Sequence, residues 1–188
     1  MIKQTHDSYG YKKLLVYKKA DELQSETSLL AALYPHSKTL FSLSDQMVRS
    51  ARSTKQNIVE GWKRNSTSEY YTFLGYSIAS NAELEEDCND IISGKYPDLI
   101  NKRGVMGQKG EMGAVERLPF YPLDPHLPPI VQLKLRCKEV NFLLDRLQQS
   151  LVNKMDKDHN LSSRDRMKQG EREREKEDNW LEEYLKKP

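Results

Sequence analysis

Basic side chains recur along residues 37–64 at a spacing that places several of them on one side of a helix. At about 100° per residue, one face collects four cations and a single carboxylate, Asp45. The four are Lys38, Arg49, Arg52 and Lys63, with Lys55 and Arg64 at or near the borders of the face. Cations along one helical side can meet successive phosphates and release counterions. The pattern predicts a nucleic-acid-binding face for RNA or single-stranded DNA, on which Trp62 could stack on an unpaired base; a merely solvated face is the alternative.

The same segment carries two further strips beside its main apolar seam. A polar strip consists of Gln46, Ser53, Asn57 and Glu60, and continues to Arg64. Its expected role is interhelical hydrogen bonding that sets the helix register, because buried amides and carboxylates need partners. A second apolar strip consists of Phe41, Val48 and Val59. Apolar surface this wide indicates either a central helix within one bundle or a subunit interface.

Enzymatic and metal-binding patterns are sparse in this sequence. An acidic cluster, Glu83, Glu86, Asp87 and Asp90, shares one helical face, but no Glu-x-x-His on another helix matches it, so a solvated face is expected. His6, His36, His126 and His159 lie far apart, and Cys88 and Cys137 fall on helix seams, where a thiol is normally packing. No phosphate-binding loop, nucleophile elbow or zinc-protease motif is present. We therefore expect no catalytic residues, no metal site and no cofactor.

Four apolar series predict the helices that position these residues. They cover residues 12–34, 37–64, 66–94 and 130–151, and the third opens with Ser66 and Glu69 at capping-box spacing. The second helix is expected to end near Gly61. The fourth series, Ile130, Leu133, Cys137, Val140, Leu144, Leu147 and Leu151, alternates steps of three and four like a heptad seam. The sequence predicts an all-α fold, an antiparallel up-down four-helix bundle.

Two segments break the helical pattern. Residues 97–129 carry four glycines at a three-residue period and then several prolines, which predicts a long non-helical connection between helices three and four. Residues 156–188 form a charged tail, expected to be disordered or a short docking helix. Near its end, Trp180, Leu181, Tyr184 and Leu185 would share one helical turn and could dock on this protein or a partner. The predicted domains are a bundle of residues 1–155 and a tail of residues 156–188.

Composition excludes several classes of protein. The 188 residues carry 30 Lys and Arg against 28 Asp and Glu, and only 37% are hydrophobic. No apolar run approaches the roughly 20 residues that cross a bilayer, and two cysteines cannot make a disulfide framework. A soluble protein of a reducing cytoplasm is expected, with no membrane partner. The small net charge of +2 conceals a basic segment at 37–64 and an acidic one at 66–95.

Two stretches resemble a known family. QMVRSARSTKQNIVEGWKR (46–64) matches at Gln46, Arg49, Ser53, Asn57, Ile58, Glu60, Gly61 and Arg64, and EYYTFLGYSIASNAELEED (69–87) matches at Phe73, Leu74, Ser80, Glu83 and Leu84. With a looser match at residues 14–23, the chain resembles the bacterial four helix bundle proteins encoded in intervening sequences of ribosomal RNA genes. The accessory variability determinant of diversity-generating retroelements is a relative of that family.

The resemblance implies a bundle that assembles into a ring-like homo-oligomer, with pentamers known in the family, and it implies no catalytic activity. The retroelement relative implies binding to nucleic acid and to a nucleic-acid enzyme, its reverse transcriptase, through a basic surface. Ile78 stands where a basic residue is common in the family, and both the enlarged connection and the charged tail depart from it. Two functions follow: an oligomeric adaptor that binds nucleic acid through the face of residues 37–64, or a self-assembling protein scaffold. A hydrolase or metal oxidase, based on the acidic cluster alone, is disfavoured.

Overall fold

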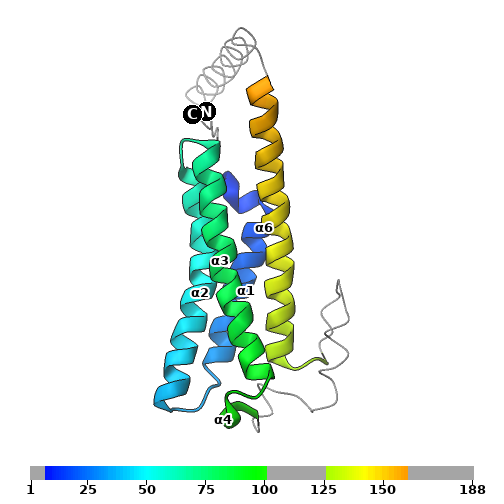
Figure 1. Ribbon diagram of the computed structural model, residues 1–188. Helices are drawn as coiled ribbons and strands as arrows, with labels where there is room; N and C mark the ends of the chain where they lie inside the picture. The colour runs from blue at the N-terminus through cyan, green and yellow to red at the C-terminus, as the bar shows by residue number, and fades with distance from the viewer. Residues whose placement is uncertain (1–6, 101–125, 161–188) are drawn as a thin grey trace, which may run out of the picture.

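A computed structural model of the protein describes residues 7–100 and 126–160, and every regular element in these residues is helical. Four long helices make the body: α1 (Leu15–Ala31), α2 (Lys38–Lys63), α3 (Thr67–Ile92) and α6 (Pro129–Asn160). Successive helices run in opposite directions, and each packs against two neighbours, so that α6 closes the bundle against both α3 and α1 (Figure 1). The predicted all-α, up-down four-helix bundle is confirmed.

Most of the core comes from the apolar series read from the sequence, and Tyr70, Leu99, Val131 and Leu135 add to it. The buried members are Val16, Ala20, Leu23 and Leu30 of α1, Tyr34 after it, Leu40, Leu43, Met47, Ala51 and Ile58 of α2, Leu74, Leu84, Cys88 and Ile91 of α3, and Ile130, Leu133, Cys137, Val140 and Leu144 of α6. Leu147 and Leu151 continue the α6 seam and are half-buried. Burial of each large side chain contributes about 1.5–3 kcal/mol before chain entropy is counted.

Serine side chains cap α2 and α3. The Ser37 hydroxyl accepts from the Leu40 N–H at 3.3 Å, and the Ser66 hydroxyl accepts from the Glu69 N–H at 3.1 Å. The Ser66 hydroxyl also donates to the Glu69 carboxylate at 2.9 Å. Each cap provides a partner for a backbone N–H that the first turn of a helix cannot pair internally. The predicted start of the third helix is therefore confirmed.

The start of the first helix differs from the prediction. A short 3-10 turn, η1 (Gly10–Lys13), precedes α1, so the first α-helix begins at Leu15. α2 ends at Lys63, two residues after Gly61, which agrees with the predicted end near this glycine. A Cβ at position 61 would lie 2.6 Å from Tyr70 Cδ2 and 2.8 Å from Phe73 Cβ. Gly61 therefore also allows the close approach of α2 and α3, which was not predicted.

The connection after α3 begins with a helical turn, α4 (Pro97–Ile100). The prediction that residues 97–129 contain no helix is therefore wrong for residues 97–100. Pro97 is the first residue of this helical turn, and a proline is tolerated there because its missing N–H would have no partner within the helix. Leu99 of this turn is fully buried. Residues 101–125 lie outside the described residues, as do 161–188 with the predicted docking residues Trp180, Leu181, Tyr184 and Leu185. The last helix, α6, ends at Asn160, which lies past the predicted boundary between the bundle and the tail at residue 155.

Candidate nucleic-acid interface on helix α2

Because α1 and α3 flank α2, one side of this helix faces solvent, and three of the predicted cations lie there. Lys38, Arg49 and Arg52 are exposed, and the Arg49 side chain keeps 77% of its surface. Arg49 Nε lies 3.0 Å from the Asp45 carboxylate one turn earlier. A pair of this kind at the surface contributes about 0–1 kcal/mol, so a phosphate can compete with Asp45 for Arg49.

The other three predicted cations contact residues that lie outside α2. Lys55 Nζ lies 2.9 Å from the Asp21 carboxylate of α1, and its side chain is only 19% exposed. Lys63 donates to the Ser8 carbonyl, and its Nζ lies 4.7 Å from the centroid of the Tyr9 ring.

The Arg64 guanidinium lies 4.3 Å from the centroid of the Phe73 ring of α3, a cation–π geometry. Lys38, Arg49 and Arg52 are thus exposed and make no contact of this kind with another helix among the described residues. Lys63 and Arg64 are also exposed but contact Tyr9 and Phe73, respectively, and Lys55 is half-buried beside Asp21.

Trp62 is committed to packing. Its ring meets Tyr70 edge-on, with centroids 6.1 Å apart, and its Nε1 donates to the Asp7 carbonyl at 3.1 Å. A Cβ on Gly10 would lie 2.6 Å from the Trp62 ring, so this glycine allows the start of the chain to lie against α2. The predicted stacking of Trp62 on a base is not supported by this geometry. The accessible aromatic ring of α2 is Phe41, which is 73% exposed.

Gln46, the first member of the polar strip of α2, faces α3, and so does Ser50, which lies outside the predicted strip. Gln46 Nε2 donates to Asp87 Oδ1 at 3.1 Å, and the neighbouring Ser50 hydroxyl donates to Glu83 Oε2 at 3.2 Å. These are interhelical hydrogen bonds of the predicted kind, since each pairing works only in one register of the two helices. Further along the strip, Ser53 and Glu60 are exposed and Asn57 is half-buried.

The acidic face of α3 is not uniformly solvated, and the expectation fails at Asp87. This residue is 8% exposed, and its Oδ2 has no hydrogen-bond partner among the described residues. Burial, followed by the charges of Asp90 and Glu83, raises the pKa of Asp87 to about 6. One signal was present in the sequence: Asp87 follows Leu84 by three positions and precedes Ile91 by four, which is core spacing.

The interface of α3 and α6 has its own buried polar contact, which sequence reasoning missed. Asn81 is fully buried, and its Nδ2 donates to the Cys137 carbonyl at 2.7 Å. Cys88 of α3 and Cys137 of α6 are both buried, as predicted. Burial, followed by a hydrogen bond with the Cys88 thiol, raises the pKa of the Cys137 thiol. In the described part of the chain, no group of three or more His, Cys, Asp or Glu residues has a geometry that would hold a metal ion.

Fold and surface together define an all-helical bundle protein with exposed cations on one helix. None of its described helices combines the length and the apolar character needed to cross a membrane. Residues 12–96 match the family model described as 23S rRNA-intervening sequence protein, so this part of the chain is similar to that family. The match covers α1, α2 and α3 and thus both stretches that carry the sequence resemblance. A search of curated proteins found no match.

Proposed function

We propose that this protein is a non-enzymatic, oligomeric helical-bundle adaptor that binds RNA or single-stranded nucleic acid through the outer face of α2. The observation that carries the proposal is the row of exposed cations Lys38, Arg49 and Arg52 on the solvent side of that helix. The family description supports it, because it refers to an intervening sequence in ribosomal RNA and names no reaction.

The three cations suit a flexible phosphate backbone. Lys38 and Arg52 lie about 21 Å apart along the helix axis at a rise of about 1.5 Å per residue, with Arg49 one turn before Arg52. Arginine can bind a phosphate through two parallel N–H groups, and Arg49 and Arg52 are close enough to clamp neighbouring phosphates. Phe41 offers an exposed ring on the same helix, on which a base can stack.

Binding of a labelled single-stranded RNA pool, followed by anisotropy across a salt series, tests the proposal. We expect retention at low salt and a steep loss as salt rises. The double variant Arg49→Glu with Arg52→Glu should weaken binding and reduce the slope of log K against log salt by about 1.4 per protomer, at about 0.7 per phosphate contact of a single strand.

A charge-matched control keeps this test specific. Arg146 and Lys154 of α6 are also exposed, and Arg146→Glu with Lys154→Glu makes the same change in net charge on another helix. This control should leave most of the binding intact. Equal losses in the two double variants would show that only net charge matters, and absence of binding by the wild type at low salt would refute the proposal.

A second candidate function is a self-assembling scaffold without a nucleic-acid role, and exposed aromatic surface favours it. Phe41 of α2 is 73% exposed and Tyr76 of α3 is 54% exposed, more than packing within one bundle requires. Exposed apolar groups of this size are common at protein interfaces. A ring of copies, a pentamer for example, would cover them. Light scattering over a wide concentration range tests this: Phe41→Ser should shift an oligomer toward monomer, whereas a wild type that is monomeric throughout would exclude the scaffold.

A further inference from the structure

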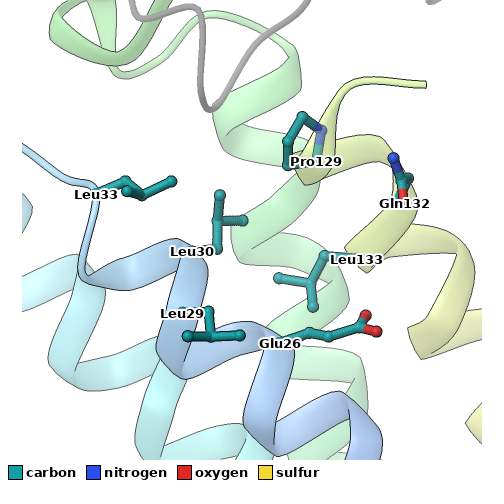
Figure 2. A pocket seen from close by; sticks show the side chains of 7 residues that line it. All are labelled: Glu26, Leu29, Leu30, Leu33, Pro129, Gln132 and Leu133. Carbon is teal, nitrogen blue, oxygen red and sulfur yellow. The ribbon is translucent and has the colours of Figure 1, made fainter. Parts of the chain in front are cut away.

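A cavity of about 230 Å³ opens between the end of α1 and the start of α6 (Figure 2). Leu30 and Leu133 are buried at its base, while Leu29 and Leu33 line it at 71% and 51% exposure. Leucines that line a cavity and still face solvent leave apolar surface that a ligand or a segment of chain can cover. The volume is suited to one large side chain.

The charge beside the cavity is negative. Arg136 of α6 pairs with Glu22 and Glu26 of α1, and Lys19 pairs with Glu22 and with Glu139. Three carboxylates thus share two cations. Glu26 lines the cavity, and burial raises its pKa. An occupant that brings a cation would restore the balance.

The C-terminal tail contains a segment whose apolar side chains suit this cavity. Residues 161–179 hold only Leu161 and Met167 as apolar side chains, whereas Trp180, Leu181, Tyr184 and Leu185 follow at a spacing that would put them on one helical turn. Glu182 and Glu183 lie within this segment and Lys186 and Lys187 follow it, so residues 180–187 carry no net charge and the match to the cavity is apolar.

The chain is long enough for this segment to return to the cavity. From Leu133 to Asn160, α6 spans about 40 Å at about 1.5 Å per residue. Residues 161–180 cover up to about 66 Å when extended at about 3.3 Å per residue, but only about 30 Å if wholly helical. The return therefore requires non-helical backbone in part of residues 161–179, and Gly170 and Ser162–Ser163 permit it.

We propose that residues Trp180–Leu185 dock in the α1–α6 cavity of their own chain, with an aromatic side chain between Leu29, Leu33 and Leu133. The tether supplies a high effective concentration, so a small apolar contact suffices. Docking covers the exposed leucines Leu29 and Leu33. It leaves the outer face of α2 free, so it is independent of the function proposed above.

Amide hydrogen exchange on the full chain tests this proposal, with the exchange rate of residues 178–187 as the readout. In the wild type these amides should exchange more slowly than those of a free peptide of the same sequence. Leu33→Glu should remove that protection, because it places a charge in the cavity, and Leu29→Glu is the second variant if the first loses helical content. Both leucines are exposed enough that the bundle should tolerate the change.

Leu15→Glu is the matched control, since Leu15 is 56% exposed and lies on α1 like Leu29, but does not line the cavity. It should leave the protection of the tail unchanged. Free-peptide exchange in the wild type, or equal protection in the Leu33→Glu and wild-type chains, would overturn the proposal. Protection that disappears on dilution would also overturn it, because the occupant would then be the tail of a second copy.

Discussion

Replacement of Gly61 by alanine tests whether this glycine allows α2 and α3 to approach closely. The new Cβ would lie 2.6 Å from Tyr70 Cδ2 and 2.8 Å from Phe73 Cβ, both far inside van der Waals contact. Tyr70 is 2% exposed and cannot swing away, and the Cβ of Phe73 moves only with the backbone of α3. The helices must therefore separate locally.

The magnitude follows from two opposing effects. Overpacking of a tight interface costs about 1–3 kcal/mol. Alanine in place of a helical glycine returns about 1 kcal/mol of helix propensity. For Gly61→Ala we expect a net loss of about 0–2 kcal/mol in the free energy of unfolding, and a Tm lower by up to several degrees for a chain of this size.

Gly75→Ala is the matched comparison within α3. A Cβ at position 75 would meet only Gln148 Nε2, at an ordinary distance of 3.7 Å. This variant should gain about 0.5–1 kcal/mol, because no overpacking opposes the gain in helix propensity. Urea unfolding followed by circular dichroism, at one fixed protein concentration, measures both. If Gly61→Ala proves as stable as Gly75→Ala, the close-approach explanation is wrong.

Three further predictions concern buried polar groups and a helix cap. The pKa of Asp87 is raised from 3.8 to about 6 in the folded state, so between these pH values the folded protein binds more protons than the unfolded chain. The free energy of unfolding should therefore fall as pH rises from about 4 to about 6, and Asp87→Asn should remove that fall in urea titrations at several pH values. An unchanged pH profile in the variant would count against the burial of this carboxyl. Asn81→Ala should cost about 1–3 kcal/mol, because the hydrogen bond to the Cys137 carbonyl is lost inside the core; an unchanged urea midpoint would show that this contact contributes nothing. Ser66→Ala should cost about 1 kcal/mol through the lost cap on the Glu69 N–H, and thermal unfolding that matches the wild type would contradict it.

The sequence by itself determined the helices, their core faces and the caps. Apolar spacing such as that from Leu133 to Leu144 specifies which side of a helix avoids water, whatever the neighbouring helix is. Caps like that of Ser66 are equally local, since donor and acceptor lie three residues apart. For the same reason the four-helix architecture could be predicted from the apolar series at residues 12–34, 37–64, 66–94 and 130–151, and the family resemblance from residues 14–95.

Only the tertiary structure decided which of the polar residues are available. Lys55 and Arg49 belong to the same basic segment. Asp21 of α1 lies beside Lys55, whereas the side chain of Arg49 faces solvent. Asp87 was predicted to be solvated and is buried, and the sequence did not show that a Cβ at Gly61 would overlap Tyr70 and Phe73 of α3. In each case the deciding contact comes from a residue on another helix, so the free energy of the group depends on a neighbour that local spacing does not specify.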